Sequence, residues 1–221
     1  MYVHVNAAVS VDGKLSSRRR EQVRISGADD FDRVDRIRAA ADAVLVGVGT
    51  VLADDPHLTL DEEDRRVQRL RDGRSGNPTR VVVDSRARTP TDARVLDDEA
   101  TTYLLVSDEA DRDRLADLRD AGAEVIVAGG DDGRVDLRTA LDALEREGIE
   151  RVMVEGGGEV IASLFDEDLV DELTLYVGSL VIGGRDAPTL ADGEGFVEDF
   201  PRLDLVDVAR VDDGVLLSYE T

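Results

Sequence analysis

The chain has 221 residues, 50 of them acidic and 27 basic, and its formal charge is −23 at pH 7. A charge of this sign excludes a general nucleic-acid-coating protein and argues against docking on an anionic membrane, because both tasks need a basic surface. Cysteine is absent, which excludes disulfides, Cys-ligated metal centres and a thiol nucleophile.

The charged residues are skewed toward two types. Aspartate occurs 34 times against 16 glutamates, and Lys14 is the single lysine among the basic residues. Hydrophobic residues still make up 42% of the chain, so a folded core is expected rather than an acidic disordered chain. An Asp-rich, Lys-poor shell indicates adaptation to molar salt, where self-repulsion is screened. A merely acidic mesophilic protein is the alternative, but charge alone would not explain the missing lysines.

Short β-rich runs alternate with helical patterns along the chain. The predicted strands cover residues 2–9, 43–46, 80–84, 102–106, 124–127, 151–155, 173–181, 203–211 and 215–219. Neither a membrane span nor a signal peptide is recognisable, which favours a cytoplasmic protein.

Four helices are expected between these strands. Ser26 is a candidate N-cap for the first, with Phe31, Val34 and Ile37 on its apolar face. The others contain Leu115 and Leu118 with a stop at Gly122, Leu137 to Leu144 with a stop at Gly148, and residues 159–165. Residues 61–77 are polar and are expected to form a surface loop, in which a helical turn is an alternative. The pattern predicts one α/β domain over 1–221, with a mostly parallel sheet and a C-terminal antiparallel hairpin.

A glycine-rich turn follows the strand at 151–155. Gly156, Gly157 and Gly158 separate that strand from a helix, so a backbone approach to a ligand and an anion at the helix N-terminus are both expected. An ordinary tight turn is the alternative, because the G-x-G-x-x-G spacing is missing. Glu155 ends the strand at the edge of the sheet where ligands sit in α/β folds, or else it is a capping or solvated carboxylate.

A second glycine-rich segment follows the strand at 43–46. We expect a loop at Gly47, Gly49 and Thr50 that supports a site, with Thr50 as donor and Asp54 as acceptor. The alternative is that Asp54 and its two successors simply form a turn. No oxygen cage with EF-hand spacing is nearby, so no metal is expected, and His57 is interpreted as structural.

The first strand also ends in a polar turn. The segment NAAVSVDGK carries Asn6, Ser10, Asp12 and Lys14, and Asp12–Gly13 is a turn signal. Lys14 is notable because the chain otherwise avoids lysine, which suggests that a compact ammonium is needed for a phosphate. Chance survival of one lysine is the alternative.

Two arginines follow the strand at 80–84. Ser85, Arg86 and Arg88 lie at the carboxyl end of that strand, where two guanidinium groups and a hydroxyl suit a phosphomonoester such as the 2′-phosphate of NADP. The alternative is a pair of solvated arginines.

These pieces in this order resemble a known family. The segments NAAVSVDGK, ISGADD, RAAADAVLVGVGTVLADDPHLT, NPTRVVVDS, VEGGG and IGG-x-x-AP are similar to those of the reductases of riboflavin biosynthesis. The chain resembles most the stand-alone archaeal reductases of 2,5-diamino-6-(ribosylamino)-4(3H)-pyrimidinone 5′-phosphate. The resemblance implies a dihydrofolate-reductase-like fold with helices on both sheet faces, a homodimer, and NADPH as the hydride donor. The ribosylamine opens to an imine, which is reduced to the ribityl chain.

The resemblance also assigns roles to individual residues. Cofactor contacts are implied for Thr50, Asp54, Ser85, Arg86, Ala87, Arg88, Gly156, Gly157 and Gly158. Substrate contacts are implied for Asn6, Ser26, Asp54 and Glu155, and we expect Asp54 and Glu155 to be catalytic. The zinc-deaminase signature of the bacterial two-domain relatives is absent.

One departure concerns the substrate phosphate. Bacterial relatives often carry arginine just after P-x-L-T, whereas this chain has Leu60 and Asp61 there. Lys14 and Arg33 are therefore the candidates to bind the phosphate. Two other functions stay open: a reductase of the same fold acting on another pterin- or pyrimidine-like compound, and a non-catalytic nucleotide-binding domain. The exposed edges expected for the terminal strand pair also favour a homodimer.

Overall fold

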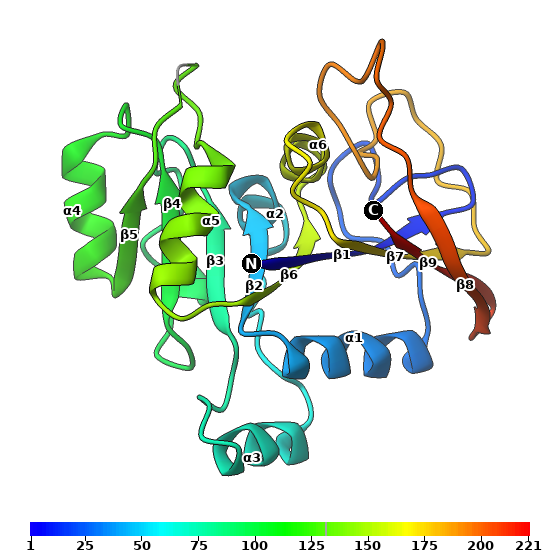
Figure 1. Cartoon of the computed structure of the whole chain (residues 1–221), viewed down its shortest axis with the longest axis horizontal. Coiled ribbons are helices and arrows are strands. Elements are labelled where there is room, and N and C mark those ends of the chain that lie inside the picture. The colour runs from blue at the N-terminus through cyan, green and yellow to red at the C-terminus, as the bar shows by residue number, and fades with distance from the viewer. Residues whose placement is uncertain (131) are drawn as a thin grey trace. The chain divides into compact units, whose positions relative to one another are not determined.

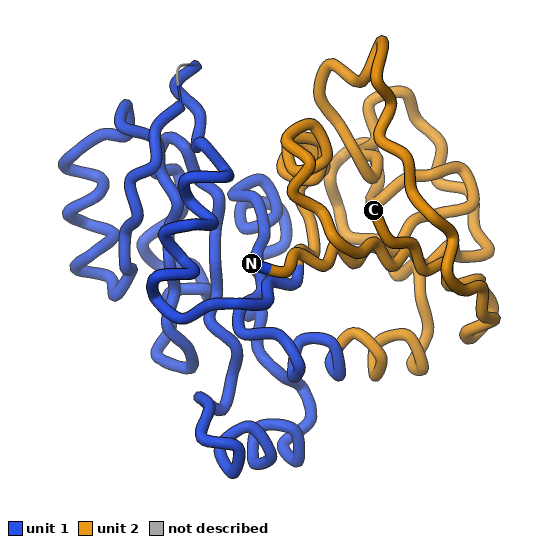
Figure 2. Tube along the Cα trace, viewed as in Figure 1, with its two compact units in different colours: residues 1, 35–153 blue, residues 2–34, 154–221 orange. Residues whose placement is uncertain are grey.

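The computed structural model describes residues 1–130 and 132–221 and contains two compact units (Figure 2). Unit 1 comprises residue 1 and residues 35–153, and unit 2 comprises residues 2–34 and 154–221. The strands form a sheet in the order β5-β4-β3-β2-β6-β1-β7-β9-β8. The β2–β3, β3–β4, β4–β5 and β1–β7 pairs are parallel, whereas β9 is antiparallel to β7 and β8. The mixed, mostly parallel sheet with a terminal hairpin is therefore confirmed.

Unit 1 is a run of alternating strands and helices. It contains β2 (Ala43–Gly47), α2 (Val48–Asp54), α3 (Glu63–Arg71), β3 (Thr79–Val83), a short 3-10 turn (Arg94–Leu96), β4 (Thr102–Val106), α4 (Arg112–Asp120), β5 (Ala123–Val127) and α5 (Leu137–Arg146). Helix α1 (Ala28–Ala40) and strand β6 (Arg151–Gly156) cross the boundary between the units. Helix α4 lies beside β5 (Figure 1).

The inner strands of unit 1, β2, β3 and β4, are largely buried on both faces. Val44, Val46 and Val82 share a core cluster with Leu115 and Leu118 of α4. Successive strand residues point to opposite faces, and Leu45, Val81 and Leu105, which lie between these positions, are also fully buried. This double burial explains why these strands read as continuous apolar runs rather than as an alternation.

The helix boundaries of unit 1 follow ordinary capping chemistry. The Asp111 carboxylate accepts N–H bonds from the first turn of α4, and the Asp136 carboxylate does the same for α5. Gly122 and Gly148 follow these helices with positive φ angles of 99° and 86°. Both predicted stops are thus confirmed.

The segment 61–77 is not only a loop, because residues Glu63–Arg71 form helix α3. The Asp35 carboxylate accepts the backbone N–H groups of Asp61 and Glu62 just before the helix, and it pairs with Arg65 at 2.6 Å. Arg69 donates to the carbonyl oxygens of Ala39 and Ala41 at the end of α1. The helix is held by polar contacts, which is why its sequence lacks the apolar stripe that would have predicted it.

Unit 2 contains the remaining elements. They are β1 (Tyr2–Ser10), α6 (Gly158–Asp166), β7 (Glu172–Gly178), β8 (Asp204–Val211) and β9 (Gly214–Glu220). Strand β7 ends three residues earlier than predicted. A Cβ atom on Gly178 would lie 2.5 Å from the carbonyl oxygen of Ile25, so the chain passes very close to a neighbouring segment there.

The first helix departs from its predicted capping and packing. Ser26 does not cap α1; the Asp212 carboxylate, from the β8–β9 turn, accepts the N–H groups of Asp29 and Asp30. Phe31 is 49% exposed and has Arg24 over its ring, whereas Asp30 is only 2% exposed. The expected apolar face is wrong at Phe31, because the helix buries a paired carboxylate on its inner side instead. Among all described residues, no helix is long and apolar enough to cross a bilayer.

Candidate active site

The loop after β3, residues 84–89, is built around one buried aspartate. Asp84 is fully buried, and its Oδ2 accepts hydrogen bonds from the backbone N–H and the hydroxyl of Thr89, both at 2.7 Å. The backbone N–H of Ala87 donates to the Asp84 carbonyl at 3.0 Å. Ala87 is 1% exposed and has a φ of 54°, a left-handed conformation uncommon for alanine. The loop is therefore fixed from within.

The loop presents two arginines outward. Arg86 and Arg88, on either side of the buried Ala87, are exposed, and no residue in the described part of the chain forms a hydrogen bond or ion pair with their guanidinium groups. The Ser85 hydroxyl faces inward and accepts the N–H of Val135 at 3.2 Å. Two uncompensated cations on a rigid loop suit an anionic group such as a phosphomonoester. The Ser85 hydroxyl accepts one N–H within the protein and keeps its own proton to donate to such a group.

The segment after β2 is a helix rather than the expected loop. Gly47 is the N-cap of α2, and Thr50 lies half-buried within that helix. Val48 and Val51 of α2 belong to the same core cluster as Ala87, so α2 and the loop 84–89 adjoin the same apolar core within unit 1. Gly47 and Gly49 lie at the start of this short helix, which directly follows the buried strand β2.

Asp54 ends α2 and differs from its neighbour Asp55. Asp54 is half-buried, burial raises the pKa of its carboxyl, and no described residue donates a hydrogen bond to that carboxylate. Asp55 adopts a φ of 41° at the C-cap and accepts the N–H of Arg94 at 2.8 Å. The turn-forming role considered for this pair therefore belongs to Asp55. His57 is exposed and faces Asp97 at 3.2 Å.

In unit 2, packing accounts for part of the glycine-rich turn. Gly157 has a φ of 93° and precedes α6. A Cβ on Gly158 would lie 2.7 Å from the Thr189 carbonyl and 2.7 Å from the Asp192 carboxylate. The third glycine is thus required by the segment 189–192 inside the protein. Glu155 is half-buried near the end of β6 and belongs to unit 2, whereas Asp54 belongs to unit 1.

Lys14 connects the turn after β1 to the segment at 187–189. Its ammonium donates to the Ala187 carbonyl at 3.1 Å, and its backbone bridges Thr189. Nearby, Asp12 accepts the N–H groups of Ile182 and Gly183 at 3.0 and 2.8 Å. Hydrogen bonds from Ser10 and from these N–H groups lower the pKa of Asp12 to about 2. The motifs DGK and IGG-x-x-AP, distant in sequence, therefore form one structure that also adjoins Gly158 through Thr189.

Asn6 and Arg33 are brought together on the face of β1. Arg33 donates to the Asn6 Oδ1 atom at 2.8 Å and pairs with the buried Asp30 at 2.8 Å. The Arg33 charge is thus compensated within the protein, which weakens its candidacy as a phosphate ligand. Ser26 is 9% exposed in the segment before α1, and no described residue bonds to its hydroxyl.

Several polar residues at these places escaped the sequence analysis. Asp84 follows three valines, where an acidic residue at a strand end could have signalled a loop anchor. His4 and Thr174 lie beside Asn6 on β1 and β7, and the alternation of Tyr2, His4 and Asn6 is the signal that marks one polar strand face.

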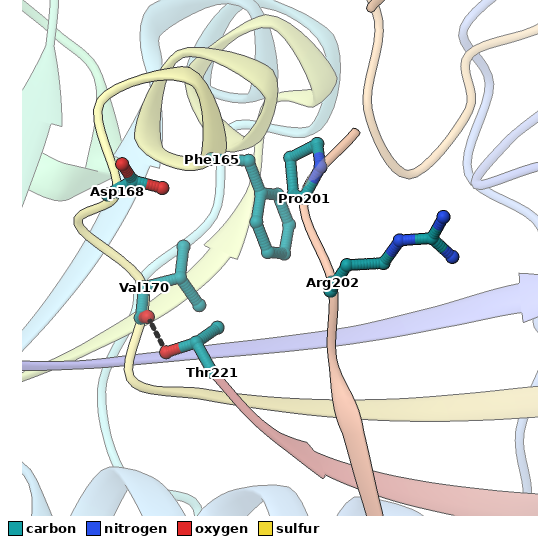
Figure 3. Close-up of a pocket in the computed structure, with 6 residues that line it drawn as sticks. All are labelled: Phe165, Asp168, Val170, Pro201, Arg202 and Thr221. Atoms are coloured by element: carbon teal, nitrogen blue, oxygen red, sulfur yellow. Dashed lines mark hydrogen bonds between the residues drawn. The ribbon is translucent and has the colours of Figure 1, made fainter. Parts of the chain in front are cut away.

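A pocket in unit 2 lies at residues other than the predicted ones. In the described ranges, no group of three or more His, Asp or Glu residues is arranged to hold a metal ion. The pocket in unit 2 is lined by residues that the sequence analysis did not single out: Phe165, Asp168, Val170, Pro201, Arg202 and Thr221 (Figure 3). The Thr221 hydroxyl is bonded to the Val170 carbonyl there.

Comparisons with known proteins identify the fold and its relatives. Residues 1–217 match the RibD C-terminal domain. A 2,5-diamino-6-ribosylamino-4(3H)-pyrimidinone 5′-phosphate reductase of Archaeoglobus fulgidus is 50% identical over 197 residues, which cover 89% of each chain. The enzyme of the same name from Methanothermobacter thermautotrophicus is 44% identical over 220 residues and covers 99% of this chain and 97% of its own.

A solved structure supports the fold. A pyrimidine reductase-like protein of Corynebacterium diphtheriae superposes with a TM-score of 0.84 over 99% of this chain and 91% of its own, at 22% identity. The family match and the archaeal relatives confirm the resemblance noted in the sequence, and the superposition confirms the fold expected from it. Close homologues of the chain are named as reductases, and a reductase of this type implies a nicotinamide cofactor.

Proposed function

Because the chain belongs to the RibD C-terminal domain family, we propose that it reduces 2,5-diamino-6-(ribosylamino)-4(3H)-pyrimidinone 5′-phosphate to the ribitylamino product with NADPH. The observation that carries this proposal is the 50% identity to the Archaeoglobus reductase, which extends over 89% of both chains. We propose further that residues 1–221 act as a single reductase domain.

The loop 84–89 supports NADPH as the cofactor. Arg86 and Arg88 carry exposed positive charges that no described residue neutralises, and the buried Asp84 and Ala87 hold the loop beneath them. This cradle fits the extra phosphate that distinguishes NADPH from NADH. Thr50 and the turn at Gly156, Gly157 and Gly158 would contact the rest of the cofactor. Bound NADPH supplies the hydride that reduces the carbon of the imine.

Asp54 is proposed as the proton-handling group. Its raised pKa favours the protonated carboxyl, and none of the described residues occupies that carboxyl with a hydrogen bond. A protonated Asp54 can deliver its proton to the ring oxygen as the ribosylamine opens, and the resulting carboxylate can then stabilise the iminium. Positive charge on the imine nitrogen makes its carbon more electrophilic. Glu155 is proposed to assist from the substrate side.

The substrate is proposed to contact Asn6, Ser26 and Glu155, with its phosphate bound by Lys14. The Lys14 ammonium has one carbonyl partner at 3.1 Å, so part of its donor capacity remains for an anion. Arg33 is the weaker candidate for the phosphate because Asp30 already compensates its charge.

A single assay tests the proposed function. The purified chain in molar KCl is mixed with NADPH and the ribosylaminopyrimidinone phosphate, and NADPH oxidation is followed by absorbance. Turnover that yields the ribitylamino product is expected. Binding of NADPH without turnover would favour a reductase acting on another pterin- or pyrimidine-like compound or a non-catalytic domain, and a panel of such acceptors separates these two.

We further infer that the chain forms a homodimer adapted to high salt. Strand β8 is at the end of the sheet and exposes Leu205, Val206 and Val208, each more than half accessible. The acidic groups behind the charge of −23 repel one another more strongly when salt screening weakens. We therefore expect the folded structure or the dimer to be lost below a few tenths molar salt. Light scattering in molar KCl should give a dimeric mass, and circular dichroism against KCl should show the loss. A monomeric mass, or an unchanged spectrum at low salt, would contradict the respective inference. A cytoplasmic location without nucleic-acid or membrane partners stays an expectation.

A further inference from the structure

One face of β1 carries a line of polar side chains. Tyr2, His4 and Asn6 alternate along the strand and therefore point to the same side of the sheet. On the neighbouring strand β7, Glu172 is in register with His4 and Thr174 with Asn6. We call these five residues the polar face of β1. His4, Asn6 and Thr174 are all less than one-tenth exposed, so their hydrogen bonds form away from solvent.

The orientation of the Asn6 carboxamide follows from its contact with Arg33. A guanidinium only donates hydrogen bonds, so the Asn6 atom 2.8 Å from the Arg33 Nη2 atom must be the oxygen. The opposite orientation would place an NH₂ group against an N–H donor. Arg33 itself is fixed because Asp30, which is 2% exposed, pairs with it.

The same reasoning assigns the proton of Thr174. The Asn6 oxygen only accepts, so the Thr174 hydroxyl at 2.8 Å must donate to it. The Thr174 oxygen is then available to accept, and the His4 Nε2 atom lies 2.8 Å away. His4 must therefore carry a proton on Nε2. The donors form a directed chain from His4 through Thr174 to Asn6, which strengthens each bond.

This series of hydrogen bonds leaves the NH₂ group of Asn6 available to bind a ligand. Its oxygen is occupied by two donors, whereas no described residue accepts a hydrogen bond from its Nδ2 atom. We propose that Thr174 and His4 are positioning residues which, through Asn6, present the Asn6 NH₂ group as a donor to an oxygen of the substrate. The inference rests on the proposed function, which makes Asn6 a substrate contact. A neutral amide donor suits a sugar hydroxyl or ring carbonyl, whereas a phosphate is better bound by a cation.

Removing the Thr174 hydroxyl should release Asn6 without emptying the site. In Thr174→Val, one of the two bonds that orient the carboxamide is lost while the side chain keeps its shape. We expect the substrate KM to rise about 3- to 10-fold, the size of one hydrogen bond, with kcat nearly unchanged, because ground state and transition state lose the contact equally. Thr174→Ser, which keeps the hydroxyl, should restore the KM.

A matched control separates positioning from general damage. Thr102 is a buried strand threonine whose hydroxyl bonds to the Val95 carbonyl in unit 1. Thr102→Val makes the same chemical change and should lower the melting temperature without raising the KM. An equal rise in KM in both valine variants would overturn the proposal.

A double-mutant cycle tests whether Thr174 acts through Asn6. In the Asn6→Ala background, Thr174→Val should change the KM by less than about 2-fold, because its target is gone. A full 3- to 10-fold effect in that background would overturn the inference.

The proton position on His4 can be tested without turnover. The chain has two histidines, so His57→Gln leaves His4 as the only signal in a ¹⁵N-histidine NMR spectrum. We expect Nε2 to be protonated at pH 8 and its shift to move in Thr174→Val. A neutral ring protonated on Nδ1 alone would overturn the directed chain. This readout is independent of the substrate, so absence of turnover in the wild-type protein would count against the proposed function only.

Discussion

The loop 84–89 carries two arginines and the polar face of β1 is contacted by a third, Arg33 of α1, but these arginines differ in what they contact. Arg86 and Arg88 extend into solvent without a partner among the described residues, whereas Arg33 is 14% exposed and bonds to Asp30, Asn6 and Thr174. Free charges on a fixed loop are suited to receive a charged ligand. An arginine that is already paired with a carboxylate, as Arg33 is, is suited to hold another side chain in place. Whether an arginine already has hydrogen-bond and ion-pair partners, rather than its residue type, therefore separates a binding group from a positioning group.

The largest difference is expected when the same substitution is made in both regions. Arg33→Gln leaves the buried Asp30 carboxylate without its cation, which should cost about 3–5 kcal/mol of unfolding free energy. Arg86→Gln removes only a solvated charge and should cost less than about 0.5 kcal/mol. Urea unfolding in molar KCl measures both. Equal losses would show that the two arginines do not differ in the way proposed.

The next effect concerns the unpartnered carboxyl of Asp54. Asp54→Asn should lower kcat about 10²-fold or more, the scale of a lost proton donor, while NADPH binding weakens far less. Burial raises the pKa of Asp54, so the folded state binds this proton more tightly than the unfolded chain does. The resulting stabilisation is present at low pH and is lost as the pH rises through the folded-state pKa.

Because burial disfavours the ionised form of Asp54 in the folded state, Asp54→Asn should not melt earlier than the wild-type protein. Steady-state kinetics and melting curves of the same preparation make the test. An early-melting variant with near-normal kcat would reduce Asp54 to a turn former like Asp55.

Cofactor choice should change by a smaller amount. Replacing Arg86 and Arg88 by alanine should erode the preference for NADPH over NADH by about 1–3 kcal/mol, as expected for charge-assisted contacts to a phosphate. Replacing Arg112 and Arg119 by alanine, two exposed arginines on α4, removes the same charge elsewhere in unit 1 and serves as the control. Equal weakening of both cofactors would mean that the loop does not recognise the 2′-phosphate.

The smallest effect concerns the start of α1, which leads to Arg33. Asp212→Ala removes the carboxylate that accepts two N–H groups of the first turn and should cost about 1 kcal/mol. Ser26→Ala should leave the stability within about 0.5 kcal/mol, because Ser26 does not cap the helix. Thermal melting of the two variants decides the matter, and a larger loss for Ser26→Ala would restore its role as the cap.

The strands and most helices followed from local patterns, whereas long-range contacts did not. Runs such as RVVVD and RVMVE announce buried strands, and Gly122 and Gly148 mark real helix ends. The pattern at 61–77 allows a helical turn but does not predict the full helix α3, because its support comes from Asp35 and from carbonyls near the end of α1, none of which is visible in its own sequence. Ser26 was assigned as a cap because Asp212, which does the capping, lies 183 residues from Asp29.

The candidate site shows the same division. A strand end, a glycine turn and a pair of arginines are readable as sequence, so Asp54, Glu155, Arg86 and Arg88 could be proposed. The sequence could not show that the Ser85 hydroxyl accepts the N–H of Val135, because that bond joins residues 50 positions apart. It also could not reveal that Arg33 and Asn6 contact each other, since they belong to a helix and a strand brought together by folding.

Aspartate carboxylates in this chain repeatedly accept backbone amides. Asp12 accepts two amides of the loop at 182–183, Asp84 the amide of Thr89, Asp212 two amides of α1, and Asp111 and Asp136 the first turns of α4 and α5. A glutamate, one methylene longer, is less suited to such short-range contacts. The amide in each of these hydrogen bonds carries no formal charge, so salt screens them less than it screens ion pairs. Each hydrogen bond weakens once its carboxylate is protonated. Many of the aspartates therefore stabilise the fold as acceptors for backbone N–H groups. Acid should destabilise the fold by protonating these carboxylates, and added salt does not prevent this effect.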